Sequence, residues 1–450
     1  MATIELDSIL PDIETLIEND SRGALLNILL DMHPADIEEV LNHLRKEERV
    51  YLFGLLPTEL ASQVLTELDT PIVEQVLEDS DEQKISELVD FMESDDAADF
   101  VANLNEEVAD KVLKQMPKKD SREVIQLLTH EEDTAGGIMA LEFIAMPTTA
   151  TVNETIEKIR EMRDDSEEVY NIFVVDDHGK LLGSVSLTDL VLAKGYVTLR
   201  EIMEVDVHSV AVDIDQEEVA NMFRKYDLVS LAVVDLQNRP VGRITIDDII
   251  DVMEEEGAED LSYVAGAPDE EILEESSFIV SKARIPWLLV SFFGNILAAF
   301  ILEAFDATLE RFIASAFFFP LIMAMGGSTG QQASVIVVRG LATGDIFLSD
   351  TRYRLIREFR ISLLTSIFFA TLVFGVIYFW QGVLFAAILS LTMFMVINAA
   401  AIMGTAIPLI FKKLNIDPAL ATAPFIATTN DVFGLLIYLA VLTSFLGIFG

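Results

Sequence analysis

One acidic residue lies near the middle of the last apolar segment of the chain. The segment reads PALATAPFIATTNDVFGLLIYLAVLTSFLGIFG, and the acidic residue is Asp431. A carboxylate at bilayer depth costs at least a few kcal/mol unless it is paired or lines a water-filled path. No Lys or Arg lies in the interior of the apolar segments, so a structural ion pair is the weaker explanation, as is a protonated spectator carboxyl. We therefore expect Asp431 to bind a cation on a transmembrane path.

Five apolar stretches must position this residue, because each is long enough, at roughly 20 residues, to cross a bilayer as a helix. They are Pro286–Phe305, Phe312–Val338, Phe359–Trp380, Gly382–Phe411 and Pro418–Phe449. With the N-terminus inside, all basic residues of this region except Arg311 fall on the cytoplasmic side. This asymmetry predicts a multi-pass protein of the plasma (inner) membrane, with cytoplasmic N-terminal domains and the C-terminus outside.

Polar and helix-breaking residues interrupt these spans. The second span carries Pro320, Gly326, Gly327, Gly330, Gln331 and Gln332, and the last two spans carry Asn398, Pro408, Pro424 and Asn430. Glycines in a span can simply allow close helix packing. The alternative is a bent, polar-lined helix whose freed carbonyls face a water-filled route. With Asp431 among these residues, we favour a shared aqueous path.

The charge of the chain is divided unevenly. The net charge is −45 over 450 residues. From Ser281 onward there are ten basic and eight acidic residues, a net charge of +2, which leaves 20 basic and 67 acidic residues, a net charge of −47, before it. Such acidity argues against nucleic acid as a partner and for cations. The chain has no cysteine, which excludes thiolate metal sites, and its start, MATIELDSIL, does not predict a signal peptide.

The soluble region contains an internal repeat. YNIFVVDDHGKLLGSVSLTDLVLA, from Tyr170, aligns with VSLAVVDLQNRPVGRITIDDIIDV, from Val229, and Ile138-Met139 and Ile202-Met203 open the two copies. This pattern resembles a tandem pair of CBS domains, which are usually ligand sensors that dimerise. The resemblance implies a nucleotide ribose contact at Asp189 and Asp248, and hence ATP as a candidate ligand. Both residues could instead be helix N-terminal carboxylates.

The segments on either side of the repeat are helical in pattern. Four similar units before it, such as LFGLLPTELASQVLTEL, begin with helix-start signals and predict a superhelical, solenoid-like domain. Asp95, Asp96 and Asp99 are expected to form a solvated helix face there. After the repeat, DVMEEEGAEDLSYVAGAPDEEILEE is an acidic, amphipathic connector between the sensor and the membrane region.

The assembled order resembles the MgtE family of magnesium channels over essentially the full length. The matching stretches are HEEDTAGGIM, YDLVSLAVVD, ITIDDIIDVMEEEGAED, MGGSTGQQASVIVVRGLATGD and DPALATAPFIATTNDVFGLLIY. Ser328, Gln331-Gln332 and Ala423 depart from the residues common in the family. The fold class is then an all-α superhelical N-domain, an α/β tandem CBS pair and an α-helical membrane domain of five transmembrane helices. The expected boundaries are 1–135, 136–200, 201–256, a connecting (plug) helix region at 257–281, and 282–450.

The resemblance implies a homodimeric Mg²⁺ channel that cytosolic Mg²⁺ closes, with Asp431 as the pore aspartate. It also implies a set of regulatory metal ligands in the soluble domains. These are Asp95, Asp99, Glu217, Asp227, Asp248, Asp251, Glu259 and Asp260. Physical chemistry also favours this ion, since Mg²⁺ gives up its waters reluctantly and is often held through them by one or two carboxylates.

Two other functions compete with a Mg²⁺ channel. One is a less selective carrier of Co²⁺, Mn²⁺ or Ni²⁺, coupled to H⁺ or Na⁺, although the membrane region has no His and only one deep carboxylate. The other is a membrane-anchored CBS nucleotide sensor, for which five polar-interrupted spans are more than an anchor requires. No nucleophile–base pair or Walker A sequence occurs, so we expect no enzyme and a flux driven by the electrochemical gradient.

Overall fold

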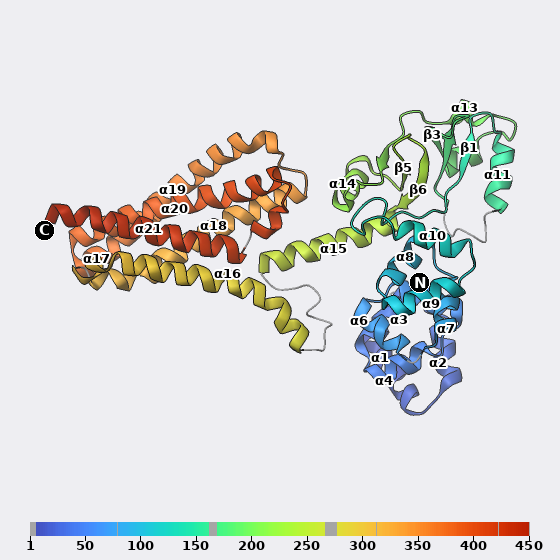
Figure 1. Cartoon of the computed structure of the whole chain (residues 1–450), viewed down its shortest axis with the longest axis horizontal. Coiled ribbons are helices and arrows are strands. Elements are labelled where there is room, and N and C mark those ends of the chain that lie inside the picture. Colours follow the sequence, from blue (N-terminus) through green and yellow to red (C-terminus); the bar gives the residue numbers. More distant parts are fainter. Residues whose placement is uncertain are drawn as a thin grey trace. The chain divides into compact units, whose positions relative to one another are not determined.

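The structure is a computed structural model that describes residues 6–78, 80–161, 169–265, 277–311, 313–421 and 423–449 (Figure 1). The chain divides into two compact units, Met1–Met253 and Glu254–Gly450. The division falls inside one helix, α15 (Ile246–Ala265). The boundary that we expected at residue 256 is therefore not a break in secondary structure, and residues 257–265 of the connector continue the last CBS helix.

Short helices build the first part of unit 1. They are α1 (Leu6–Glu18), α2 (Arg22–Leu29), α3 (Pro34–His43), α4 (Lys46–Phe53), α5 (Thr58–Thr66), α6 (Thr70–Leu77), α7 (Glu82–Val89), α8 (Ser94–Ala102), α9 (Glu106–Gln115) and α10 (Asp120–Leu127). Helices this short are marginal alone, so packing must stabilise them. This packing is between alternate helices, since α3 packs on α5, α5 on α7 and α7 on α9. Each repeating unit thus contacts the next one, as in the expected solenoid.

The repeat forms two sheets with the same topology. The first contains β1 (Ala145–Pro147), β2 (Asn171–Val175) and β3 (Leu181–Ser186), and the second contains β4 (Ser209–Ala211), β5 (Ser230–Val234) and β6 (Pro240–Thr245). In each sheet the first pair is parallel and the second is antiparallel. Val174 pairs with Gly183, and Val233 with Gly242. These pairs occupy the positions that the sequence alignment matches, which confirms the repeat.

The two paired glycines explain how the copies interlock. A Cβ on Gly242 would collide with Met139 and Ala140, and a Cβ on Gly183 would collide with Met203 and Glu204. The opening segment of each copy thus packs on the sheet of the other copy. Four helices complete the pair: α11 (Val152–Glu161), α12 (Leu187–Leu192), α13 (Leu199–Ile202) and α14 (Gln216–Tyr226).

One hydrophobic core joins the helical domain to the second CBS copy. It runs from α1 through α10 and continues with Val219, Phe223, Val233 and Ile249. The first CBS copy has its own core, around Ile172 and Val185. Because burial of apolar area is the main stabilising term, the helical domain and the second copy form one packed body, which brings α8 against β6.

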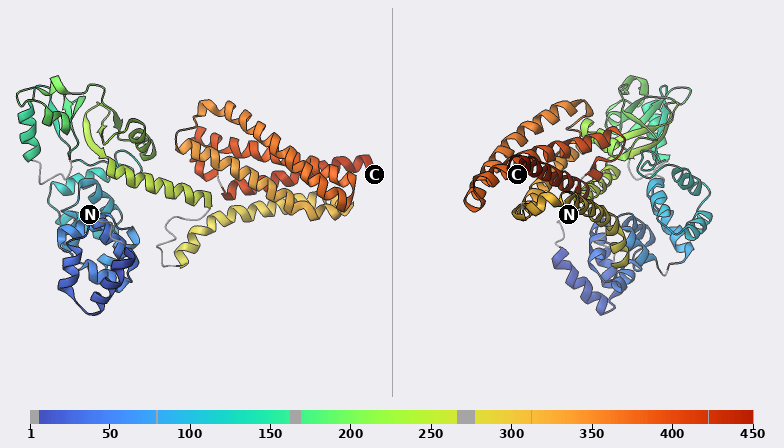
Figure 2. Two further views of the ribbon diagram at one scale, coloured as in Figure 1. Left: turned by 180° about the vertical axis from the view of Figure 1, so that it is seen from behind. Right: turned by 60° about the vertical axis from the view of Figure 1, so that its left-hand side comes forward.

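The main helices of unit 2 are long. They are α16 (Ser277–Ala304), α18 (Phe319–Ala342), α19 (Thr351–Gln381), α20 (Val383–Lys413) and α21 (Ala423–Phe449), with the short α17 (Asp306–Arg311) after α16. Five helices in the described part of the chain are long and apolar enough to cross a membrane. Within this unit α18, α20 and α21 pack directly on one another, as both views in Figure 2 show. Their contact surface contains the glycines of the second span and Asp431.

The second span forms one helix, α18, which runs without a break from Phe319 to Ala342. Pro320 lies in the first turn, where a missing N–H costs nothing. Gly326, Gly327 and Gly330 are buried inside the helix. A Cβ on Gly404 of α20 would collide with the backbone of Gly330, so these glycines serve close helix packing.

Candidate cation-binding sites

Asp431 lies on the face of α21 that meets the glycines of α18. Its side chain is half-buried, and Oδ1 lies 3.8 Å from the position that a Cβ of Gly327 would take. No described residue forms an ion pair with Asp431. Since Gly327 has no side chain, the carboxylate faces bare backbone. A Cβ at this position would reach only ordinary van der Waals contact, so a side chain larger than that of alanine would crowd the carboxylate.

Asn398 has a different role from the one we expected. Its Nδ2 donates to Ser366 Oγ and to the Phe394 carbonyl, both at 2.7 Å, and its Oδ1 accepts from Ser362 Oγ at 2.9 Å. The amide is only 8 % exposed. The bonds to Ser362 and Ser366 join α20 to α19, so Asn398 holds these two helices together and is not part of an aqueous path with Asp431.

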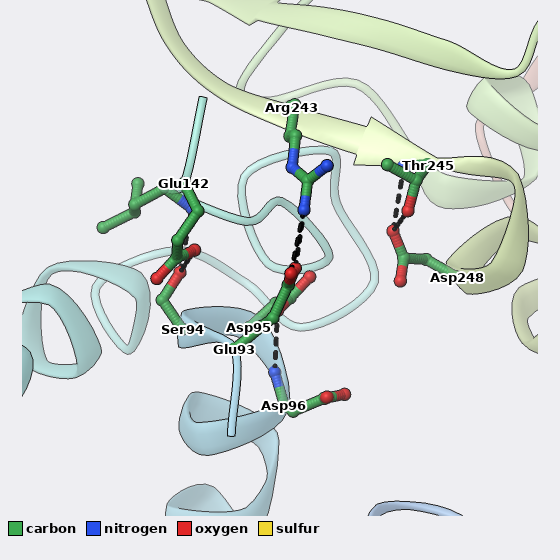
Figure 3. A network of polar contacts seen from close by, with 9 residues as sticks. Glu93, Ser94, Asp95, Asp96, Glu142, Arg243, Thr245 and Asp248 are labelled. Carbon is green, nitrogen blue, oxygen red and sulfur yellow. Dashed lines mark hydrogen bonds and ion pairs between the residues drawn. The ribbon is translucent and has the colours of Figure 1, made fainter. Parts of the chain in front are cut away.

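A second polar cluster lies where the helical domain meets β6 (Figure 3). Glu93 precedes α8, and Arg243 on β6 donates from Nη2 to both Glu93 carboxylate oxygens, at 2.8 and 3.0 Å. Ser94 donates from Oγ to Glu142 at 2.7 Å and accepts the Leu141 N–H at 2.8 Å. These contacts fix the first turn of α8, and with it the acidic side chains that follow.

Asp95 is buried at this junction. The residue is 7 % exposed, so the expected solvated face is wrong for Asp95. Desolvation raises the pKa of its carboxyl well above the usual range, and the charges of Asp96, Asp248 and Glu93 raise it further. Burial also raises the pKa of Asp248, although the Thr245 N–H and hydroxyl donate to this carboxylate at 2.9 and 2.8 Å. The core between α8 and β6 brings these acids together.

Asp96 belongs to the same cluster, and neither it nor Glu93 was among the residues that we expected to bind metal. Desolvation at the junction raises the pKa of Asp96 to about 8, with further contributions from the charges of Asp248, Glu93, Asp99 and Asp251. The residue nevertheless keeps an exposed surface, so an ion arriving from solvent can reach it. The three-residue offset to Asp99 on α8 was the only sequence signal for this grouping.

The structure brings together some of the expected regulatory residues but not all. Glu217 lies in the first turn of α14, whereas Asp227 ends this helix with a φ of 51°. Ten residues along a helix span about 15 Å, so these two carboxylates cannot share an ion within one chain. Glu259 is exposed on α15. The side chain of Asp260 and the connector residues 266–276 lie outside the described residues.

The oxygen atoms of these acids are suitable ligands for a metal ion. Carboxylate oxygens are hard ligands that suit Mg²⁺. Among the side chains that the structure describes, no three metal-ligating groups stand close enough to bind one ion directly. An ion at the junction between α8 and β6 would therefore be held partly through its own waters, as Mg²⁺ commonly is.

The two candidate nucleotide-binding acids have matching local geometry. Ser186 donates from Oγ to Asp189 Oδ2 at 2.7 Å and accepts the Asp189 N–H at 3.0 Å, at the start of α12. Asp248 has the corresponding place after Thr245, at the start of α15. Both carboxylates thus take part in helix capping. Asp189 is exposed, whereas Asp248 faces the acidic cluster.

Comparison with known proteins covers every part of this arrangement. The model of the MgtE intracellular N domain matches residues 32–133, the CBS domain matches 135–196 and 199–255, and the MgtE family of divalent cation transporters matches 319–441. The magnesium transporter MgtE of Thermus thermophilus is 34 % identical over 434 residues, which cover 95 % of this chain and 96 % of that protein. The chain belongs to the MgtE family.

Other MgtE proteins support the same assignment. The magnesium transporter MgtE of Bacillus subtilis is 28 % identical over 93 % of each chain. The solved cytosolic domain of the Mg²⁺ channel MgtE in complex with ATP is 34 % identical, with a TM-score of 0.50, over 53 % of this chain and 97 % of that one. The soluble part of a magnesium transporter is 26 % identical, with a TM-score of 0.51, over 56 % of this chain and 99 % of that one. The expected fold class is confirmed.

Proposed function

We propose that this MgtE family protein carries Mg²⁺ across the membrane into the cytoplasm, down the electrochemical gradient, and that Asp431 binds the ion on the way. The observation that carries the proposal is the half-buried Asp431 carboxylate in a span-length helix, facing Gly327. A charge at this depth is costly without a partner. A passing cation supplies that partner during transport, and relatives along nearly the whole chain are named magnesium transporters.

The chemistry of the site suits an ion that keeps its waters. In a homodimer, two copies of Asp431 lie around one axis. A ring of two carboxylates attracts a divalent cation, and binding through water remains weak enough for the ion to leave. Gly327 contributes by leaving room beside the carboxylate. The chain is thus suited to select a small, strongly hydrated ion by charge and size, without stripping its shell.

Closure by cytosolic Mg²⁺ is the regulatory part of the proposal. Asp95, Asp99, Asp248 and Asp251 gather acidic charge at the junction between α8 and β6, and Asp96 and Glu93 add to it. Mg²⁺ relieves this repulsion. It closes the pathway only if these carboxylates bind the ion more tightly in the closed state than in the open state. We assign the same role to Glu217 and Asp227, and to Glu259 and Asp260 on α15.

Orientation and nucleotide binding complete the proposal. From the distribution of basic residues we assign the soluble unit to the cytoplasm and the C-terminus to the outside. The solved MgtE cytosolic domain that holds ATP is 34 % identical to this chain, and Asp189 is exposed beside its Ser186 cap. We therefore assign ATP to the CBS pair, with the Asp189 carboxylate as the ribose contact and Asp248 as the corresponding residue of the second copy.

Ion flux into liposomes tests the proposal. Purified full-length protein should take up Mg²⁺ when internal Mg²⁺ is low, and uptake should fall as internal Mg²⁺ rises into the millimolar range. Asp431→Ala and the nearly isosteric Asp431→Asn should abolish uptake while the protein stays folded. An Asp431→Asn protein that conducts like the wild type would overturn the assignment. Equal uptake of Co²⁺, Mn²⁺ and Ni²⁺ would favour the less selective carrier instead.

A further inference from the structure

Asn430 is a buried polar residue of the membrane unit that the function described above leaves unexplained. It is 2 % exposed, and neither its Oδ1 nor its Nδ2 has a hydrogen-bond partner among the described residues. A buried amide without partners costs free energy, and more so where no bulk water is near. Such a group is either strained or pairs with a water or a ligand.

The position of Asn430 indicates which ligand this is. A Cβ on Gly330 of α18 would collide with Asn430 Nδ2, just as Gly327 faces the Asp431 carboxylate. Gly327 and Gly330 are three residues apart, and so lie on the same face of α18, one turn apart. The amide and the carboxylate therefore meet one glycine-lined helix face side by side. Separation of α18 and α21 by one water diameter, about 2.8 Å, would let a water from the shell of an ion reach both groups.

We propose that Asn430 is the second polar ligand of the Asp431 site, and that its amide hydrogen-bonds a water molecule in the hydration shell of the transported cation. This inference rests on the proposed function. When the amide is turned about its Cβ–Cγ bond so that Oδ1 takes the place of Nδ2 at this face, Oδ1 accepts from a metal-bound water, whose protons are made more acidic by the ion, so the bond is charge-assisted. Asp431 supplies the charge that attracts the ion, and Asn430 adds a directional contact to its shell.

Asn398 provides a matched control within the same bundle. Both residues are buried asparagines on neighbouring helices, but the Asn398 amide already makes three hydrogen bonds to described atoms. Loss of the Asn398 amide should therefore weaken the fold and leave ion binding unchanged. Loss of the Asn430 amide should weaken ion binding, and cost the fold little.

The test measures Mg²⁺ uptake by full-length protein in liposomes, over a series of external Mg²⁺ concentrations with low internal Mg²⁺. Asn430→Ala should raise the half-saturating concentration about tenfold, while the rate at saturation is retained. Asn398→Ala should lower the thermal midpoint and keep the wild-type half-saturation. An unchanged half-saturation for Asn430→Ala, or a change that only follows loss of folded protein, would overturn the inference.

A second measurement, on a milder variant, tests the inference if the Asn430→Ala protein does not fold. Hexaamminecobalt(III) is a fixed-shell analogue of a hydrated cation, and its ammines donate hydrogen bonds as metal-bound waters do. In the milder Asn430→Ser protein, block of uptake by this probe should need about tenfold more of it; an unshifted block would overturn the inference. If Asp431→Ala still conducts, the proposed function and this inference fail together. If only the Asn430 variants behave like wild type, the inference alone fails.

Discussion

The guanidinium of Arg243 on β6 donates to both carboxylate oxygens of Glu93, which lies 150 positions earlier in the chain, just before α8. The Arg243 side chain is 7 % exposed and that of Glu93 is 25 % exposed. The acids Asp95, Asp96 and Asp248 lie near this pair. The arginine thus acts as a built-in cation at a junction that otherwise gathers negative charge, and it ties the helical domain to the second CBS copy.

The first prediction follows from this ion pair. Arg243→Ala leaves Glu93 partly buried without its partner among other acids, and loss of one member of a buried pair is strongly destabilising. We expect the local stability of α8 to fall by about 3 kcal/mol. Hydrogen exchange of the α8 amides in the full-length protein, with Mg²⁺ chelated, measures this loss.

Lys46→Ala is the control for that experiment. Lys46 pairs with Glu78, but the two side chains are 43 % and 61 % exposed, and exposed pairs contribute about 1 kcal/mol or less. Exchange should change little near this pair. Millimolar Mg²⁺ should restore part of the protection lost in Arg243→Ala, because the ion replaces the missing positive charge. Wild-type exchange of α8 in Arg243→Ala without Mg²⁺ would contradict the prediction.

The second prediction concerns pH. Because the pKa of Asp96 is raised from 3.8 to about 8, the folded state binds more protons than the unfolded state between these values. The free energy of unfolding of unit 1 should therefore decrease as the pH rises from about 4 to about 8. Mg²⁺ must displace the proton on Asp96, so its apparent affinity should rise roughly 25-fold between pH 6 and pH 7.5.

Calorimetric titration of the full-length protein with Mg²⁺ checks this prediction. Proton release should appear as a dependence of the binding heat on the ionisation enthalpy of the buffer. Asp96→Asn removes the titrating group, so the pH dependence of the affinity should become markedly smaller. Asp177→Asn, an exposed carboxylate in the turn after β2, should behave like the wild type. Equal pH dependence in the wild type and Asp96→Asn would rule out Asp96 as the linked group.

The sequence alone predicted the features that depend on local pattern. The alignment of the two CBS copies appears in the strand register of Val174 and Val233, because a repeated pattern forms a repeated fold. The capping roles of Asp189 and Asp248 also follow from Ser or Thr three residues earlier. The lengths of the apolar stretches predicted the five spans. The helix α19 nevertheless begins at Thr351, eight residues before the expected start, because polar residues can extend a helix beyond its apolar part.

Contacts between distant segments could not be predicted in this way. Whether Asp95 is solvated depends on β6, which comes much later in the chain, and a single sequence does not pair α8 with this strand. For the same reason Asp96 and Glu93 were not recognised as members of the acidic cluster. Asn398 and Asn430 look alike in the sequence. Only the packing of α19, α20 and α21 shows that one amide is satisfied and that the other has no described partner.

The third prediction tests the close approach of α18 and α20. A Cβ on Gly404 would collide with the carbonyl group of Gly330, and backbone cannot move aside as a flexible side chain can. Gly404→Ala should therefore destabilise the membrane unit by about 1–3 kcal/mol, the usual cost of overpacking, and lower the thermal midpoint in detergent. Gly375→Ala on α19 meets nothing within 4 Å and should match or exceed wild-type stability, since alanine favours helix. Equal midpoints for both variants would contradict the prediction.

The last prediction concerns transmission along α15. This helix carries Asp248 in its first turn and Glu259 eleven residues later, which places them about 16 Å apart along one continuous helix. A shift of the helix caused by ion binding near Asp248 can then be transmitted to the connector. If Glu259 and Asp260 bind Mg²⁺ preferentially in the closed state, Glu259→Gln with Asp260→Asn should shift inhibition to higher cytosolic Mg²⁺, while conduction through the Asp431 site is unchanged. Patch recordings over a series of cytosolic Mg²⁺ concentrations measure the shift.

A control variant, Glu14→Gln with Glu18→Gln, removes the same charge from exposed positions on α1 and should leave the inhibition curve unshifted. An unshifted curve in the α15 variant would mean that these acids are only a solvated helix face.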